Sequence, residues 1–206
     1  MLWQQLLWWF FDRLYTDLAP GYDLVAWLAS GGLWYRWVDV AARFLAGDPV
    51  LEVGFGRGRL AVRLAHMGRT VVGLDRSPQM VMATRRLALR AGAPLHLVQG
   101  SGDALPFGTA TFGTLITTFP APYVLAPQTQ AEFARVLKPG GRWIWVDAPR
   151  WPGWPRRPAV LWLFQRLGHL HGALQSKVPH HLAVRTVTVP VEETVVAVRI
   201  WEKPHG

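Results

Sequence analysis

From residue 49 onward, short aliphatic runs alternate with amphipathic stretches along the chain. The runs are five to seven residues long and rich in Val, Ile, Leu and Thr, which predicts strands, and the stretches between them repeat apolar residues at helical spacing. The predicted strands are 49–54, 70–75, 95–99, 112–118 and 142–148, and the predicted helices are 58–67, 78–91 and 127–137. Strands that alternate with helices indicate a parallel sheet with helices on both faces, an α/β doubly wound fold.

The two ends of the chain have a different pattern. They are predicted to contain an amphipathic helix at 2–18, a helical stretch at 33–45, a Pro- and Trp-rich insertion at 149–158, an apolar helix at 159–174, and β-branched runs at 182–189 and 194–201. The apolar residues of the first helix cover far more than a core-facing stripe. The two β-branched runs predict a terminal antiparallel hairpin, so we expect about seven strands in all.

The length of the chain sets its organisation. A chain of 206 residues is ample for one domain with a single core and short for two. We expect one domain over 1–206, divided into N-terminal helices (1–46), a ligand-binding core (47–148), and the insertion, helix and hairpin (149–206).

Composition and charge narrow the classes of function. The chain has no cysteine, which excludes disulfides, thiolate metal sites and cysteine nucleophiles. No secretory signal and no run of 18 uncharged apolar residues is present, so the expected location is the cytoplasm. The net charge of +9 suits a polyanion such as nucleic acid or an anionic bilayer, although an arginine-rich genome would give the same excess. Six of the twelve tryptophans fall within the first 37 residues.

The most informative stretch follows the first predicted strand. Glu52 precedes three glycines at alternate positions, Gly54, Gly56 and Gly58, and then a helical pattern begins. Glycines are required where a tight turn uses positive φ angles and where a ligand lies against the bare main chain. The second predicted strand ends at Asp75, where a carboxylate can accept hydrogen bonds from both hydroxyls of a ribose. Together these features indicate a nucleoside-bearing cofactor.

The spacing of the glycines separates the candidate cofactors. A dinucleotide fingerprint is G-x-G-x-x-G, whereas here the third glycine comes one residue early and a carboxylate precedes the loop. That carboxylate suits a cationic ligand better than a pyrophosphate, and S-adenosylmethionine carries both an ammonium and a sulfonium group. A glycine loop alone is also found in strand-to-helix turns that bind nothing.

The glycine loop is the first of four motifs that follow one another in order along the chain. They are Pro49 to Gly58, Val98 to Phe107, Thr111 to Thr117 and Phe133 to Gly141. With these motifs the chain resembles the class I S-adenosylmethionine-dependent methyltransferases, which implies a Rossmann-like doubly wound sheet, S-adenosylmethionine as cofactor and S-adenosylhomocysteine as product.

The resemblance implies roles for individual residues. Glu52 is expected to bind the amino group of the cofactor, directly or through water, and Asp75 the ribose hydroxyls. The glycines of the loop let the methionine moiety approach the main chain. The other expected binding residues are Arg76 and Met80 beside the adenine, Ser101, Gly102 and Asp103 near its amino group, and Thr117 at the end of the fourth strand.

One motif departs from the family pattern. Related sequences read G-D-A-x-x-L-P-F, with the aspartate accepting a hydrogen bond from the adenine amino group. Here Ser101 stands at that place, and Asp103 comes two residues later. Either the serine hydroxyl accepts this hydrogen bond without charge assistance, or Asp103 turns in to do so.

The N-terminal region narrows the resemblance. Tyr22 to Leu24, Leu28, Ser30 to Leu33, and Arg36 with Trp37 resemble the start of the ubiquinone/menaquinone C-methyltransferase group. This likeness implies N-terminal lid helices over the cofactor. Tyr22 would cover the sulfonium with the face of its ring, or else pack beneath the lid.

Methyl transfer is an in-line displacement that positioning alone can drive, so no metal is expected. His169 and His171 do not indicate a zinc site either, because H-x-H on a helix points the two rings apart. A base is needed only if the acceptor loses a proton, and no spacing singles one out. The candidate bases are Tyr123, His169, His171, His180 and His181.

The sequence analysis predicts a methyltransferase acting on a small lipophilic acceptor, quinone-like or otherwise lipid-soluble. A nucleic-acid partner is disfavoured, because Thr117 to Tyr123 lacks the N-P-P-aromatic run used to grip a flipped base. An RNA methyltransferase and a membrane-peripheral protein that binds the cofactor without turnover remain alternatives. Residues 1–17 carry tryptophan and phenylalanine with a few charges, which favours an interfacial helix on an anionic membrane.

Overall fold

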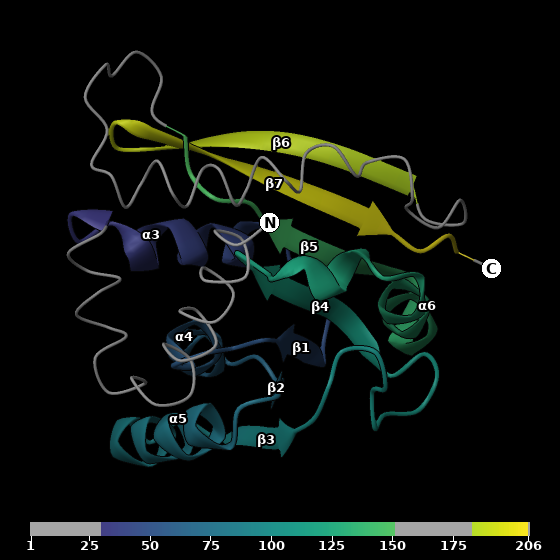
Figure 1. The fold of residues 1–206 in the computed structure, drawn as a ribbon, viewed down its shortest axis with the longest axis horizontal. Helices are drawn as coiled ribbons and strands as arrows, with labels where there is room; N and C mark the ends of the chain where they lie inside the picture. Colours follow the sequence, from purple (N-terminus) through teal and green to yellow (C-terminus); the bar gives the residue numbers. More distant parts are fainter. Residues whose placement is uncertain (1–29, 151–182, 206) are drawn as a thin grey trace, which may run out of the picture.

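The computed structural model describes residues 30–150 and 183–205 of the chain (Figure 1). The strands are β1 (Val50–Val53), β2 (Val71–Asp75), β3 (Leu95–Gln99), β4 (Phe112–Thr118), β5 (Leu137–Val146), β6 (Ala183–Val191) and β7 (Thr194–Glu202). The helices are α3 (Trp34–Val38), α4 (Arg59–His66), α5 (Pro78–Ala91) and α6 (Pro127–Val136), with 3₁₀ helices η2 (Asp39–Phe44) and η3 (Pro122–Leu125).

Within these residues, the strands form one sheet in the order β3-β2-β1-β4-β5-β7-β6. Strands β1 to β5 pair in parallel, β7 pairs antiparallel with β5, and β6 pairs antiparallel with β7. The order reverses between β1 and β4, so the carboxyl ends of these two strands flank the crevice where ligands of doubly wound sheets bind. The predicted α/β sheet of about seven strands with a terminal antiparallel hairpin is confirmed.

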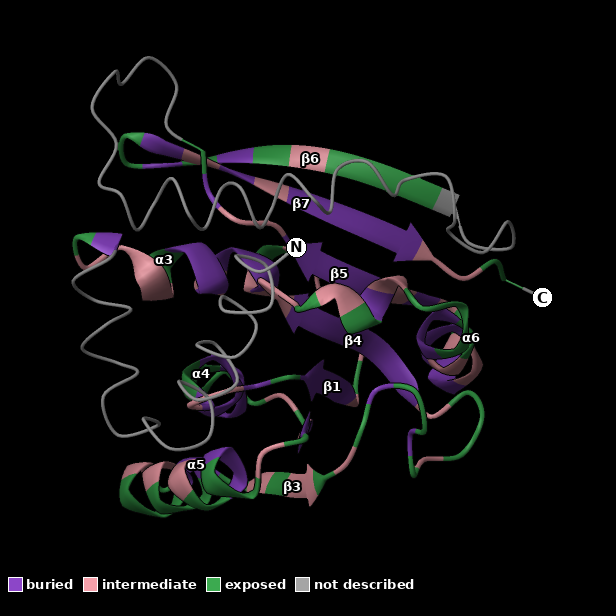
Figure 2. Ribbon diagram, in the orientation of Figure 1, coloured by how far each residue is buried: buried purple, intermediate pink, exposed green. Residues whose placement is uncertain are grey.

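The alternation of side chains along the strands builds two cores. In β1, Val50 faces the cluster formed with α3, η2, α4 and part of α5, and its neighbour Leu51 faces the cluster formed with α6. Three tryptophans stack in the second cluster, with ring centroids 4.3 Å apart for Trp143 and Trp201 and 5.9 Å apart for Trp143 and Trp145. Strands β4, β5 and β7 are accordingly mostly buried, while much of β6 and the outer side of α5 are exposed (Figure 2).

Helix α5 shows how local sequence sets the ends of an element. Ser77 caps its N-terminus by accepting a hydrogen bond from the backbone N–H of Met80 at 3.3 Å, and Pro78 occupies the first turn, where its missing N–H costs nothing. Gly92 ends the helix in the left-handed conformation at φ +62°. The prediction of a helix over 78–91 therefore agrees with the structure at both ends.

Two predicted elements differ from the structure. The helix predicted over 33–45 is split into α3 and η2, because the second half turns in the tighter 3₁₀ form. The strand predicted over 142–148 spans Leu137–Val146 instead. It begins earlier because Gly140 and Gly141 pair through their backbones with Lys203 beyond the last strand. The helices predicted at 2–18 and 159–174, and all of the insertion beyond Arg150, lie outside the described residues.

Residues of the N-terminal part contact the terminal hairpin. The indole N–H of Trp37 in α3 donates a hydrogen bond of 2.9 Å to the hydroxyl of Thr194 at the start of β7. In the described ranges, 30–150 and 183–205, no helix has the length and apolar character needed to cross a bilayer.

Candidate functional site

A cavity of about 510 Å³ opens at the carboxyl ends of the parallel strands. Its wall comes from five segments: 34–38, 52–60, 74–78, 100–102 and 118–123. These are α3 and the segments that leave β1, β2, β3 and β4, so the sheet topology alone brings them together.

The glycine loop after β1 forms one side of the cavity. Gly54, Gly56 and Gly58 have φ angles of +74°, +54° and +67°, which side chains other than glycine rarely adopt. A Cβ on Gly58 would lie 2.0 Å from Cγ2 of Thr84, so this glycine is needed for the packing of α4 against α5. A Cβ on Gly56 would meet no described atom within 4 Å. The backbone of Gly56 therefore faces open space that a ligand can occupy.

Asp75 joins the ends of two strands. Its Oδ2 accepts a hydrogen bond from the N–H of Gly56, and its Oδ1 accepts one from the N–H of Ser77, both at 2.9 Å. Burial raises the pKa of this carboxyl group, and the N–H groups of Ser77 and Gly56 oppose the rise. Asp75 is thus held by the glycine loop and by the start of α5, with its carboxylate in the cavity wall.

Glu52 is the most strongly perturbed group in the cavity wall. Its side chain is 2% exposed, and its Oε2 accepts no hydrogen bond in the part of the chain that the structure describes. Burial first, and the nearby charge of Asp75 second, raise the pKa of Glu52 to about 8. A buried carboxylate oxygen without a partner is unfavourable, and a cationic ligand group placed beside it would offset that cost.

The segment after β3 forms a third side. Ser101 is exposed and forms a single bridge with Ala104, while Gly102 is buried beneath Tyr123, whose Cε2 would lie 2.9 Å from a Cβ on that glycine. No side chain could be added at Gly102 without moving the tyrosine ring. Gly102 and Tyr123 both line the cavity.

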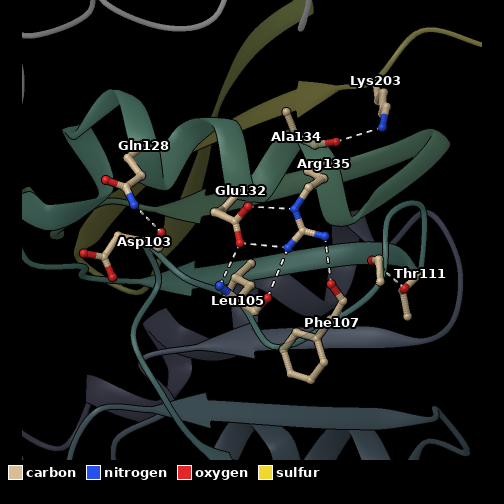
Figure 3. Close-up of polar contacts among 10 residues, drawn as sticks. Asp103, Leu105, Phe107, Thr111, Gln128, Glu132, Ala134, Arg135 and Lys203 are labelled. Carbon is tan, nitrogen blue, oxygen red and sulfur yellow. Dashed lines mark hydrogen bonds and ion pairs between the residues drawn. The ribbon is translucent and has the colours of Figure 1, made fainter.

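An ion pair on α6 holds the chain that follows Ser101 and Gly102 (Figure 3). Arg135 binds both carboxylate oxygens of Glu132, through Nε at 2.6 Å and Nη2 at 2.7 Å. The same guanidinium donates to the carbonyls of Phe107 at 2.7 Å and Leu105 at 3.1 Å, and Glu132 accepts from the N–H of Leu105 at 2.7 Å. Arg135 holds the pKa of Glu132 below its usual value. The pair thus fixes the backbone of the Leu-Pro-Phe motif.

Aromatic side chains form a further part of the cavity wall, which we call the aromatic wall. It includes Trp34 and Tyr35 from α3, and Phe119 and Tyr123 from the segment after β4. The rings of Trp34 and Phe119 meet edge to face with centroids 4.8 Å apart. Phe119 has a φ of +45°, a conformation that a bulky residue rarely adopts and that functional sites often retain. The hydroxyl of Tyr123 would lie 3.2 Å from a Cβ on Gly54, so it reaches over the glycine loop.

The cavity brings together most of the residues expected from the sequence. Those in its wall are Glu52, Gly54, Gly56, Gly58, Asp75, Arg76, Ser101 and Gly102. Of the five candidate bases, Tyr123 also lines it. Tyr22, His169, His171, His180 and His181 lie outside the described residues.

Three expected residues lie outside the cavity wall. Met80 is buried against Phe55 and Val81, and the backbone carbonyl of the exposed Asp103 accepts a hydrogen bond from Gln128. Thr117 is fully buried, where its hydroxyl accepts a hydrogen bond of 3.0 Å from the indole N–H of Trp143. Thr118, its neighbour on the other face of the strand, lines the cavity instead.

The aromatic wall contains residues that the sequence analysis did not assign to the site. Trp34, Tyr35 and Phe119 line the cavity together with Pro120 and Pro122. The run Phe119 to Tyr123 follows the carboxyl end of a predicted parallel strand. That position in the sequence could have indicated that these residues line the site.

The chain is similar to known methyltransferases. Residues 50–141 match the methyltransferase domain family. The chain is 34% identical over 158 residues to a ubiquinone/menaquinone biosynthesis C-methyltransferase of Syntrophotalea carbinolica, covering 74% of this chain and 65% of that protein. It is 32% identical over 143 residues to a demethylmenaquinone methyltransferase of Thermus thermophilus, covering 66% and 64%. The chain thus spans just under two thirds of the length of these relatives.

Solved structures share the fold at low sequence identity. The PH0226 protein of Pyrococcus horikoshii is 17% identical with a TM-score of 0.59, and the match covers 93% of this chain and 95% of that one. A geranyl diphosphate C-methyltransferase of Streptomyces coelicolor, solved with Mg²⁺, geranyl diphosphate and S-adenosyl-L-homocysteine, is 17% identical with a TM-score of 0.59 over 83% and 78%. The likeness to these structures concerns the fold alone.

Proposed function

Since the chain carries a class I S-adenosylmethionine-dependent methyltransferase domain that resembles the ubiquinone/menaquinone C-methyltransferase group, we propose that it transfers a methyl group from S-adenosylmethionine to a small lipophilic acceptor. When bound, the cofactor supplies a methyl group on a positively charged sulfur. Quinone-like molecules and other lipid-soluble rings are the acceptor class that we assign.

The observation that carries the proposal is the pair of carboxylates around the glycine loop. Glu52 has a buried oxygen without a partner in the described chain, which suits the ammonium of the methionine moiety. Asp75 lines the same cavity at the end of β2, which suits two ribose hydroxyls. The open space beside Gly56 admits the ligand against the bare backbone of the glycine loop. The cavity therefore fits the cofactor on charge, hydrogen bonding and space.

The other cofactor contacts follow from the same pose. Ser101 and Gly102 would face the edge of the adenine, and Arg76 would flank the adenine ring. The support is that all three residues line the cavity. Met80, Asp103 and Thr117 lie outside the cavity wall and would not contact the cofactor directly, whereas Tyr22 would cover the sulfonium from the lid.

The aromatic wall supports the assignment of the acceptor. Trp34 and Phe119 offer apolar ring surface in the cavity wall, and a flat apolar molecule would bury area there. These rings would orient the acceptor and exclude water, which is what an in-line displacement requires from the protein. Tyr123 is the candidate base in the cavity wall for an acceptor that must lose a proton.

Transfer of label from methyl-labelled S-adenosylmethionine tests the proposal. We expect label in an organic extract when a demethylated quinol is offered, and none when the protein is omitted. Label in RNA, which the net charge of +9 would favour, supports the RNA methyltransferase alternative. Cofactor binding without label in any acceptor supports a binding protein without turnover. Either of these two results contradicts the proposal.

We further propose that the protein is cytoplasmic and that residues 1–17 bring it to an anionic membrane, where lipophilic acceptors reside. The support is the amphipathic sequence of this segment, whose Trp and Phe side chains favour the headgroup boundary. Sedimentation with anionic vesicles should be weaker for a chain lacking 1–17 than for the full chain. Equal sedimentation of the two would contradict this role of the segment.

A further inference from the structure

The outer side of α5 combines exposed apolar and cationic side chains. Met82 and Leu89 are 53% and 77% exposed, and they lie seven residues apart on one stripe of the helix. Exposed arginines flank this stripe, Arg85 on one side and Arg86 and Arg90 on the other. We call these five residues the basic apolar face.

The positive charge of this face is not neutralised locally. None of its three arginines forms an ion pair with a carboxylate in the structure as described. The sequence explains why, since residues 53–102 contain eight arginines and a single acidic residue, the buried Asp75. An anion supplied from outside the chain is therefore the natural counter-charge.

The face begins close to the rim of the cavity. Ser77 and Pro78, at the start of α5, line the cavity, and Met82 follows four residues later, about 6 Å along the helix axis. The inner side of α5 packs against β3 and α4, which fixes the direction of the outer side (Figure 1, Figure 2). A surface docked on α5 would thus lie near the cavity entrance.

We propose that the basic apolar face of α5 docks on an anionic lipid surface. Arginines beside exposed aliphatic side chains match the boundary between phosphate headgroups and acyl chains, where both kinds of group find partners. A nucleic acid would meet the same arginines, but the face offers no aromatic ring for base stacking, and its centre is aliphatic. The inference goes beyond methyl transfer and uses a surface separate from residues 1–17.

Vesicle partitioning of the full chain tests the proposal, with point substitutions on the face. The probe is phosphatidylcholine vesicles with and without about a third phosphatidylglycerol, at low salt. Arg86→Gln with Arg90→Gln should lower partitioning to the anionic vesicles roughly 25-fold, about fivefold for each arginine. Leu89→Gln should lower it further, because the aliphatic contact is lost.

A matched control lies at the other edge of the sheet. Val184 and Arg185 on β6 are exposed, so Val184→Gln with Arg185→Gln removes one apolar side chain and one charge far from α5. The matched α5 variant is Arg86→Gln with Leu89→Gln. The control should partition to the anionic vesicles within about twofold of the original chain. The α5 variant should partition more weakly than the control.

Three results would overturn the proposal. The first is equal partitioning of the α5 variants and the control, and the second is no partitioning of the full chain to anionic vesicles. The third is that the α5 variants lose binding to a single-stranded RNA oligonucleotide while they keep their binding to lipid. The last result would assign the face to nucleic acid. The vesicle measurement contains no methyl acceptor, so a negative result there does not bear on the proposed methyl transfer. A negative methyl-transfer assay likewise does not change the interpretation of vesicle binding.

Discussion

Replacement of Glu52 by glutamine tests the electrostatics of the cavity, because the amide keeps the shape of the side chain and cannot ionise. The pKa of Glu52 is raised from 4.5 to about 8, so over this range the folded chain binds a proton that the unfolded chain releases. The contribution of this carboxyl group to stability is full below pH 4.5 and is lost as the pH rises toward 8. Between pH 5 and pH 7.5 the loss amounts to about 3 kcal/mol, at about 1.4 kcal/mol per pH unit within the window.

The assay is urea unfolding of the original chain and Glu52→Gln at several pH values from 5 to 8. We expect the original chain to lose about 3 kcal/mol relative to the variant over this interval. Glu193→Gln, at an exposed carboxylate in the β6–β7 turn, removes the same formal charge and should follow the original chain. A difference between the original chain and Glu52→Gln that stays constant within about 1 kcal/mol would refute the reasoning.

The same residue links ligand binding to pH. An ammonium beside Glu52 favours the ionised carboxylate, so binding of S-adenosylhomocysteine at neutral pH should release a proton from Glu52, and its affinity should rise from pH 6 to pH 8. Calorimetry in buffers of different ionisation enthalpy measures this proton. The proton release should be smaller for Glu52→Gln, and equal release by both chains would contradict the assignment of the ammonium.

Four further substitutions test other parts of the site. Gly58→Ala should lower the free energy of unfolding by about 2–5 kcal/mol, because its Cβ collides with Thr84 at a positive φ. Gly56→Ala should cost only about 1–2 kcal/mol in urea unfolding but weaken S-adenosylhomocysteine binding more than about tenfold; equal effects of the two variants on both quantities would contradict the distinct roles. Ser101→Asp should leave calorimetric affinity equal or stronger, whereas a tenfold loss would mean that Ser101 does not face the adenine amino group. Arg135→Lys should lower the thermal unfolding midpoint through a loss of about 1–3 kcal/mol, because lysine cannot hold Glu132 and two carbonyls together; an unchanged midpoint would exclude a stabilising role for this pair.

The parts of the fold that local chemistry determines were predictable from the sequence. Ser77, Pro78 and Gly92 mark the ends of α5 by capping, and the aliphatic runs mark β3 and β4. The start of β5 was not predictable, because Pro139 to Gly141 favour a turn by composition. The pairing with Lys203, more than sixty residues away, places them in a strand.

The candidate site also combines features that local sequence determines with features that depend on the rest of the fold. The glycine loop and Asp75 were predictable because both depend on positions at strand ends. Thr117 shows the limit, since side chains alternate along a strand and a shift of one residue exchanges the buried face for the cavity face. The aromatic wall depends on the positive φ of Phe119 and on the packing of α3 against the segment after β4, and neither is encoded in a local pattern.

The central claim is that Asp75 binds the ribose of S-adenosylmethionine in this cavity. Titration calorimetry of the original chain and Asp75→Ala with S-adenosylhomocysteine tests it most directly. We predict that the original chain binds and that the variant binds more weakly by about 2–4 kcal/mol, because two charge-assisted hydrogen bonds are lost. Circular dichroism of the variant serves as the control for folding, since Asp75 also accepts hydrogen bonds from Gly56 and Ser77. No binding by the original chain, or a folded variant with affinity within about threefold, would contradict the claim.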